Sequence, residues 1–309
     1  MNYSKKLAAI LKAADWPQEQ LARELHVSFP TLNAWINKRA QPRQKALLDI
    51  DRLYLTIVGA DSLDEQELAE TKNAALGLRA SAKRLAESQE TLDRLSLYLT
   101  YHTNTIEGST MTLSDVENVL FEHKVLSNRT AIEQAEARNH QAALIWVLDQ
   151  LVERGDQLSL DEEFILGIHL RLMNGIMSDA GMYRKHSVRI MGAHVPLANW
   201  AKVPDLVAQL ADKLNQSSKD MVATLAETHA VFEQVHPFSD GNGRTGRLLL
   251  FAQALRANLT PPLVTKERKF AYYKYLELAQ TKGKFEPLEL FIAQSVLFCR
   301  ELLNPTEKQ

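Results

Sequence analysis

The chain has a single cysteine, Cys299, among its 309 residues. One cysteine excludes an internal disulfide and fits a reducing cytoplasm, and the apolar pattern around it predicts a place in the core. No Cys/His spacing typical of a zinc site is present. No apolar run approaches the ~18 residues that a membrane helix needs, and no charged-then-apolar leader opens the sequence, so we expect neither a membrane span nor a signal peptide.

Internal repeats and low-complexity tracts are absent, and so is a large net charge. The chain is 45% apolar with a net charge of −2, which allows a sizeable core and a small accessory domain. The charge is unevenly distributed, because residues 1–60 hold nine Lys or Arg against five Asp or Glu. A basic module on an acidic body is typical of a protein that binds nucleic acid.

The first sixty residues contain two short helical patterns separated by a turn. Residues 18–25 form an amphipathic pattern, and residues 26–28 predict a turn. Ser28 can cap a following helix over residues 29–37, and Pro30 is tolerated in its first turn. Polar side chains that can hydrogen-bond base edges or phosphates lie on and after this second helix: Thr31, Asn33, Asn37, Lys38 and Arg39.

This string resembles a Cro/repressor-type helix-turn-helix. The resemblance implies a helix-turn-helix domain over residues 1–60 that binds DNA through residues 18–39. Repressor-type modules usually read two half-sites, so DNA binding would make the protein a homodimer. The alternative is that the module mediates protein–protein contacts, which some domains of this shape do.

The most informative segment is a twelve-residue run between two helical patterns. Residues 221–235 have helical spacing, and residues 248–255 restart a strongly apolar helix. The run between them reads His-Pro-Phe-Ser-Asp-Gly-Asn-Gly-Arg-Thr-Gly-Arg, residues 236–247. His236 stands before Pro237, which ends the first helix, and is a candidate general base.

The rest of the run predicts an anion site that opens the second helix. Gly241 and Gly243 allow a sharp turn that places backbone N–H groups at the helix N-terminus, where the dipole is positive. Arg244 and Arg247 are three residues apart and share a face, so both can reach one polyphosphate. Asp240 can hold a divalent cation that bridges phosphates, because such cations prefer carboxylate oxygens.

The run matches the motif of the Fic family, HPF-x-D/E-GNGR-xx-R, at every specified position. Members transfer AMP from ATP to a Ser, Thr or Tyr hydroxyl of a protein, so the resemblance implies ATP, Mg²⁺, a protein substrate and possible self-modification. It makes His236 the base, Asp240 the Mg²⁺ ligand, Arg244 the β-phosphate contact and Arg247 the γ-phosphate contact. The nucleotide-binding set that it implies also includes Phe238, Gly241, Asn242 and Gly243.

A second pattern lies upstream, where residues 92–103 have helical spacing. Residues 103–108, Thr-Asn-Thr-Ile-Glu-Gly, resemble the inhibitory pattern of the same family, S/T-xxx-E-G/N. Gly108 is suited to cap the helix at its C-terminus. The resemblance pairs Glu107 with Arg247, which leaves nucleotide in a pose unsuited to attack, and implies an autoinhibited enzyme. An ordinary helix end is the alternative.

The chain has one clear strand signal. Val188 and Ile190 alternate with Arg189, and Gly192 suits a hairpin turn. The segment resembles the flap that positions the target in Fic proteins, where an exposed edge takes an extended target segment by strand addition. The alternative is a simple connecting hairpin.

Two tyrosines follow on a predicted helix over residues 269–281. Tyr272 and Tyr273 resemble the pair that lines the nucleotide base pocket in Fic proteins. A tyrosine pair on a helix is also typical of a packing edge, and the sequence leaves both interpretations open.

We therefore predict an all-α protein: a helical Fic core with a small β-hairpin flap, preceded by a small helix-turn-helix domain. The predicted units are residues 1–60, a helical linker over residues 61–90, and a Fic domain over residues 91–309 that includes the inhibitory helix. Whether the linker packs on the core or stands alone in solvent is left open.

The predicted function is an autoinhibited protein adenylyltransferase with a DNA-binding module. A DNA-binding regulator whose core senses nucleotide is a competing interpretation, although the intact His236 and Asp240 argue against a degenerate site. Two further interpretations keep the site but change the reaction: removal of AMP by means of Glu107, and transfer of phosphate or phosphocholine. Arg247 and the Glu107 opposite it favour ATP as the donor.

Overall fold

The computed structural model describes residues 2–60, 63–190 and 195–304, and within these ranges the protein is helical without a strand. One isolated antiparallel bridge joins Arg79 to Leu259. No helix in the described ranges is both long and apolar enough to cross a membrane. The prediction of an all-α core is thus confirmed.

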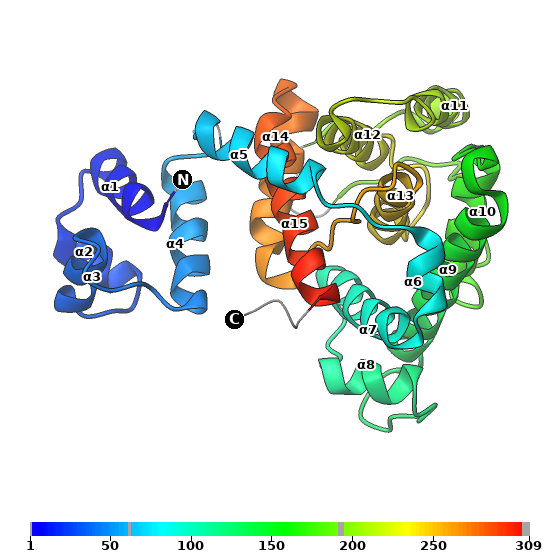
Figure 1. Cartoon of the computed structure of the whole chain (residues 1–309), viewed down its shortest axis with the longest axis horizontal. Helices are drawn as coiled ribbons and strands as arrows, with labels where there is room; N and C mark the ends of the chain where they lie inside the picture. The colour runs from blue at the N-terminus through cyan, green and yellow to red at the C-terminus, as the bar shows by residue number, and fades with distance from the viewer. Residues whose placement is uncertain (1, 61–62, 191–194, 305–309) are drawn as a thin grey trace.

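Four helices form a small N-terminal module, at the left of Figure 1. They are α1 (Tyr3–Ala14), α2 (Gln18–Glu24), α3 (Phe29–Ile36) and α4 (Gln44–Ile57). Leu7, Ile10, Leu21, Leu32 and Ile50 are fully buried at their centre. This apolar core orients α2 and α3, which is the arrangement that the helix-turn-helix pattern predicts.

Helices α5 (Glu65–Leu76) and α6 (Ala82–Glu87) connect the module to the core and pack on it. Helix α5 lies against α15, and α6 lies against α9. Ala75 and Leu85 are buried in the core clusters, and Lys72 forms an ion pair with Glu289 of α15 and another with Asp220. The question left open by the sequence is therefore decided in favour of a packed segment.

Nine α-helices of the described chain complete the larger unit. They are α7 (Gln89–Ile106), α8 (Leu113–Leu120), α9 (Ala131–Arg154), α10 (Glu162–Met173), α11 (Val203–Leu214), α12 (Met221–Val235), α13 (Asn242–Arg256), α14 (Lys269–Lys282) and α15 (Glu286–Leu303). Short 3-10 turns, η1 (Gly155–Gln157), η2 (Trp200–Lys202) and η3 (Lys266–Arg268), lie between them. Helix α13 runs through the middle of this unit (Figure 1).

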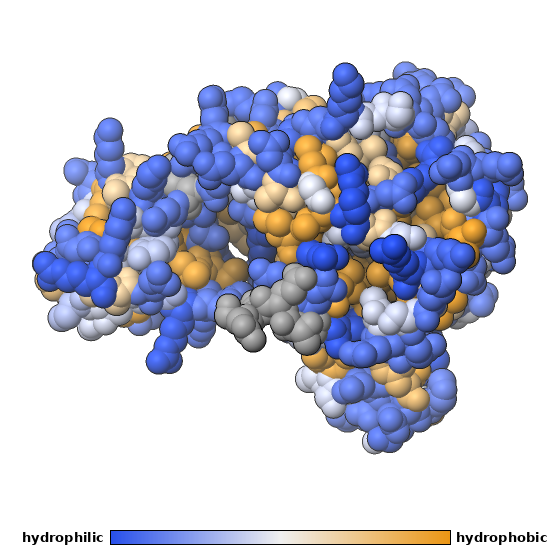
Figure 2. Space-filling view, viewed as in Figure 1, coloured by the Kyte–Doolittle hydropathy of each residue, from blue (hydrophilic) through white to orange (hydrophobic). Residues whose placement is uncertain are grey.

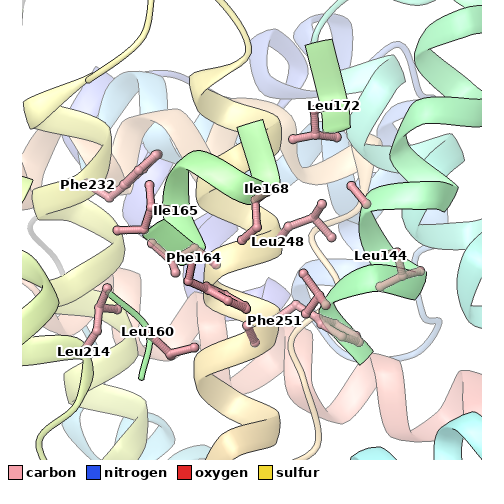
Figure 3. Close-up of a cluster of buried hydrophobic side chains, with 14 of the residues drawn as sticks. Leu144, Leu160, Phe164, Ile165, Ile168, Leu172, Leu214, Phe232, Leu248 and Phe251 are labelled. Atoms are coloured by element: carbon pink, nitrogen blue, oxygen red, sulfur yellow. The ribbon is translucent and has the colours of Figure 1, made fainter. Parts of the chain in front are cut away.

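Helix α13 is buried along nearly its whole length and is surrounded by its neighbours. Leu248 and Phe251 of this helix meet Leu144 of α9, Ile168 of α10 and Phe232 of α12 in the largest apolar cluster (Figure 3). Burial of each such side chain contributes about 2 kcal/mol relative to exposure. The N-terminus of α13, where the motif lies, is consequently held by packing on several sides.

The predicted hairpin flap is not borne out in the described residues. Val188, Arg189 and Ile190 lie in irregular backbone, and the turn expected at Gly192 falls outside the described residues. The physical reason is the absence of a neighbouring strand in the described chain. An isolated two-stranded hairpin is marginal in water, so alternation alone does not create a strand.

The module contacts the core through α4 and α14. The Arg52 guanidinium lies 5.6 Å from the ring centre of Phe270, and Phe270 packs against the apolar cluster of the module. Hydrophilic residues cover most of the visible face of both units (Figure 2).

Candidate active site

The candidate base lies where helix α12 ends. His236 is the C-cap residue and adopts a left-handed conformation with φ of 49°. Its ring Nδ1 lies 3.1 Å from the carbonyl oxygen of Glu233. A carbonyl only accepts, so Nδ1 carries the proton and Nε2 is left unprotonated in the neutral ring. Burial lowers the pKa of His236, which keeps the ring neutral and able to accept a proton.

The loop between α12 and α13 is folded on its own backbone. The Asn242 side chain accepts a hydrogen bond from the Phe238 N–H at 2.9 Å and donates to the Phe238 carbonyl at 2.8 Å. Gly241 is the N-cap of α13, and its N–H donates to Asp240 at 2.6 Å. These bonds fix the turn that presents the N-terminal amides of α13.

Two residues of the predicted nucleotide-binding set are buried supports of this loop. Phe238 is fully buried and stacks on His169 with ring centres 3.7 Å apart. Asn242 uses both ends of its amide on Phe238, which ties its side chain to the loop. Both residues thus hold the loop, and their contacts with nucleotide stay predictions. The motif alone cannot distinguish these roles, because each needs the same residue types.

The two motif arginines are buried and paired with glutamates of other helices. The Arg244 Nη1 lies 2.6 Å from the Glu136 carboxylate of α9. The Arg247 Nη2 lies 2.5 Å from the Glu107 carboxylate, and its Nε donates to the Thr103 hydroxyl at 2.7 Å. Burial by itself would lower the pKa of Arg247, but the charge of Glu107 raises it above the ordinary value. The structure thus brings Glu107 and Arg247 together.

Glu107 is presented to Arg247 by the end of helix α7. Gly108 has φ of +111°, and its N–H donates to the Thr105 carbonyl at 3.2 Å. The Ser109 N–H donates to the Asn104 carbonyl at 2.9 Å, so the two bonds form a Schellman cap. The cap fixes the backbone from which the Glu107 side chain reaches α13.

Gly243 is the residue of α13 that makes room for Glu107. A Cβ at position 243 would lie 2.3 Å from the Glu107 Oε1 and 3.0 Å from the Arg247 Nη1. Any larger residue would therefore displace the glutamate from the first turn of α13. The carboxylate occupies the place where the sequence predicts an anion site.

The predicted metal ligand, Asp240, is the most accessible charged group of the site, with a side chain that is 69% exposed. Its Oδ2 lies 3.8 Å from the Arg244 Nη2. No group of three or more His, Cys, Asp or Glu able to hold a metal occurs in the part of the chain that is described. A single carboxylate fits Mg²⁺ only when substrate phosphates supply further ligands, which is the usual manner of binding this ion.

Glu233 is a buried acid that is not part of the motif and lies near the Glu107–Arg247 ion pair. Burial raises its pKa to about 7, whereas Arg247 lowers it and Glu107 raises it further. Its Oε1 has no hydrogen-bond partner and lies 2.5 Å from the Cβ that an alanine at Gly246 would carry. The sequence signal for Glu233 is weak: it is an acidic residue in a mixed apolar and polar helix, three positions before His236.

The tyrosine pair is divided between core and surface. Tyr272 is buried and its hydroxyl lies 2.7 Å from the His229 Nε2, so it is a core residue. Tyr273 packs against it with ring centres 5.2 Å apart and remains 38% exposed. Tyr273 therefore has surface with which to contact a nucleotide base, whereas Tyr272 supports it from the core, and the role of the pair in nucleotide binding stays a prediction.

In the N-terminal module, Ser28 caps helix α3 by accepting a hydrogen bond from the Thr31 N–H at 3.3 Å. Asn33 donates to the Gln18 side chain of α2 at 3.3 Å. Lys38 and Arg39 are exposed after the helix. The predicted DNA-contacting residues therefore lie on and beside α3, with the two cations in solvent.

Comparisons with known proteins agree with both motifs. Residues 159–254 match the model of the Fic/DOC family, and residues 7–54 match a helix-turn-helix model. The protein adenylyltransferase Fic of Drosophila willistoni is 31% identical over 241 residues, which is 75% of this chain and 46% of the relative. That of Nematostella vectensis is 31% identical over 202 residues, 63% of this chain and 45% of the relative. The chain spans about half the length of these relatives.

Solved structures share the fold. The Fic-1 fragment from C. elegans has a TM-score of 0.65 at 23% identity, covering 94% of this chain and 85% of that chain. A Fic family protein from Desulfovibrio desulfuricans G20 has a TM-score of 0.59 at 23% identity, covering 79% of this chain and 74% of that chain.

Proposed function

Because the chain contains a Fic/DOC family domain and a helix-turn-helix domain, we propose that it is an autoinhibited protein adenylyltransferase with a DNA-binding module. The observation that carries this proposal is the Glu107–Arg247 ion pair, whose carboxylate lies beside Gly243 in the first turn of α13. A helix N-terminus with a buried arginine is a site for anions, and here a carboxylate of the chain itself stands in it. The polyphosphate of ATP is the competing anion.

The reacting residues follow from the geometry of the site. The unprotonated Nε2 of His236 accepts the proton of a target Ser, Thr or Tyr hydroxyl. The hydroxyl oxygen forms a bond to the α-phosphorus of ATP while the bond to the β-phosphate oxygen breaks, which gives an AMP ester and pyrophosphate. Arg244, Arg247 and the N-terminal amides of α13 stabilise the charge on the phosphates.

Mg²⁺ would be held by Asp240 together with phosphate oxygens of ATP. When bound, the ion neutralises charge on the phosphates and on the departing pyrophosphate. The Asp240 carboxylate is exposed, and its Oδ1 accepts a hydrogen bond from the Gly241 N–H, which leaves Oδ2 for the ion. That bond orients the ligand before the ion arrives.

Inhibition results from the position of Glu107. While it holds Arg247, the arginine cannot take the γ-phosphate, so ATP is not oriented for in-line attack. Breaking the pair exposes a charge-assisted donor to the nucleotide. Two further parts of the proposal concern partners: an extended target segment lies along residues 188–190, and the protein itself is one such target.

The N-terminal module would bind DNA through residues 18–39 as a homodimer. Support comes from its helix-turn-helix match, the capped α3 and the exposed Lys38 and Arg39. Lysine and arginine at a helix end contact phosphates, whereas Asn33 and Thr31 can reach base edges.

The test uses ATP labelled on its α-phosphate, with Mg²⁺, and the purified full-length protein. We compare wild type, Glu107→Gly, the double variant Glu107→Gly with His236→Ala, and Glu122→Gly as a matched removal of an exposed acid. We expect label on protein to rise sharply in Glu107→Gly, to vanish in the double variant and to stay low in Glu122→Gly.

Two results would overturn the proposal in distinct ways. No label in any variant, with ATP still bound, would favour a nucleotide-sensing DNA regulator or another donor. Release of AMP from labelled protein by wild type, lost in Glu107→Gly, would favour removal of AMP as the reaction.

A further inference from the structure

Arg184 lies immediately before the segment that carries Val188, Arg189 and Ile190, and its side chain is turned into the protein. The residue is 2% exposed. Its guanidinium donates to the carbonyl oxygens of His236 at 2.7 Å, His186 at 2.8 Å, Ala198 at 2.6 Å and Val235 at 3.3 Å. A cation held by carbonyl oxygens rather than by a carboxylate is unusual in a protein interior.

Such an arrangement is costly, because a buried cation loses its hydration, and no carboxylate in the described part of the chain forms an ion pair with Arg184. Burial accordingly lowers the pKa of Arg184. A methionine would occupy similar space without this cost. A charged group with five donors, four of whose bonds reach backbone carbonyls here, offers what a methionine cannot: bonds that join separate parts of the chain.

The four acceptors belong to two parts of the molecule. Val235 and His236 lie at the end of α12, whereas His186 precedes and Ala198 follows residues 188–190, which we propose to lie along the target. His236 is the proposed base, and its left-handed backbone is a strained conformation for a residue other than glycine. The Arg184 N–H also donates to the Pro237 carbonyl at 3.0 Å. Main chain and side chain of Arg184 therefore clamp the same turn.

We propose that Arg184 is a positioning residue that fixes His186 and Ala198, the backbone on either side of the proposed target-binding residues 188–190, to the turn that carries the base. The bound target and the base would then move together, so the distance between the target hydroxyl and the His236 Nε2 would stay constant. This inference rests on the proposed function for its catalytic meaning, but the clamp can be tested without turnover.

The charge of Arg184 adds an electrostatic effect on His236. After burial, which lowers the pKa of His236 most, Arg184 lowers it further, while the Glu233 carbonyl, Glu107 and Asp240 act in the opposite direction. Removing the Arg184 charge should raise the pKa of His236. A larger fraction of the base is then protonated at a given pH, so the acid limb of a pH–rate profile moves to higher pH.

The experiment compares Arg184→Met, Arg184→Lys and Lys185→Met, each made in the full-length wild type and in Glu107→Gly. Lys185 is the adjacent, exposed cation and serves as the matched control. Three quantities are measured: amide hydrogen exchange in residues 185–190 and 195–199, the pKa of His236 by histidine NMR assigned with His236→Ala, and self-labelling with α-labelled ATP. ATP binding checks that each variant is folded.

In Arg184→Met we expect faster exchange at both ends of the segment, a raised pKa of His236 and a loss of labelling of about 100-fold, the scale that a displacement near 1 Å produces. Arg184→Lys keeps a charge but has three donors on a flexible stem, so exchange should rise while the pKa stays near that of wild type. Lys185→Met should match its parent in all three.

Unchanged exchange at both ends in folded Arg184→Met and Arg184→Lys would overturn the inference. So would equal effects of Arg184→Met and Lys185→Met. If Arg184→Met does not fold, Arg184→Lys decides by exchange alone. Should Glu107→Gly show no labelling, the proposed function fails, whereas exchange and the pKa of His236 still decide on the clamp.

Discussion

The proposed catalytic unit, which is the larger helical unit from α5 to α15, and the N-terminal module differ in where their cations lie. In the catalytic unit Arg184, Arg244 and Arg247 are all less than 10% exposed. In the module the cations Lys38 and Arg39 stay in solvent, and the buried side chains are mainly apolar. Burying charge costs free energy, so the catalytic unit retains these groups at the expense of stability.

The difference shows how each unit would meet its partner. A site for a small polyphosphate must be organised before the ligand arrives, and buried arginines held by Thr103, Glu107 and Glu136 satisfy that need. A DNA duplex is a large, regular polyanion, so exposed lysine and arginine side chains on a capped helix suffice. Burial of charge, rather than its amount, distinguishes the two units.

The largest effect that would test this contrast is on stability. Arg247→Ala leaves the Glu107 carboxylate partly buried without its cation and removes bonds to Thr103. We expect a loss of about 3 kcal/mol in the free energy of unfolding, the low end for breaking a buried pair because Glu107 keeps some exposure. Arg39→Ala, in the module, should change it by less than about 0.5 kcal/mol. Urea unfolding measures both, and equal losses would remove the contrast.

The second test adds one methyl group at Gly243. Gly243→Ala places a Cβ against the Glu107 carboxylate, which must leave Arg247. Loss of one charge-assisted hydrogen bond, worth about 2 kcal/mol, should raise self-labelling at least about tenfold. Gly77→Ala, where the nearest atom lies at 3.4 Å, is the control. Added to Glu107→Gly, the substitution should give no further rise, and a further rise would mean that the glycine acts in another way.

The third test concerns the module surface. Asn33→Ala with Lys38→Ala should weaken DNA binding about tenfold and make its salt dependence shallower by about one unit of slope. Lys202→Ala removes the same charge from the catalytic unit and should leave DNA binding unchanged. Fluorescence anisotropy with a labelled duplex over a salt series gives both quantities. Absence of DNA binding by the intact protein at low salt would refute the DNA proposal.

The smallest effect concerns the cap of α3. Ser28→Ala removes the acceptor for the Thr31 N–H and should lower the stability of the module by about 1 kcal/mol. Ser28→Asp, which restores an acceptor, should recover most of this loss. Thermal unfolding followed by circular dichroism detects the change. If Ser28→Asp is no better than Ser28→Ala, the hydrogen bond is not the source of the stability.

The sequence predicted those features that depend on neighbouring residues. Ser28, Pro30 and Gly108 act within one turn of their own helix, so helix starts and stops were readable from the chain. Val188 to Ile190 do not form a strand in the described residues, since a strand needs a partner that local alternation does not supply. The burial of Tyr272 and Phe238 could not be read from the motif, since burial depends on distant helices.

The sequence by itself determined that the protein is helical, that it carries two units, and which side chains open helix α13. The resemblance also paired Glu107 with Arg247, but only the tertiary structure decided what Arg244 and Arg184 touch. The contacts of Arg244 with Glu136 and of Arg184 with the His236 carbonyl join residues 108 and 52 positions apart. Charge pairs at such separations depend on how whole helices pack, and packing is a property of the assembled core.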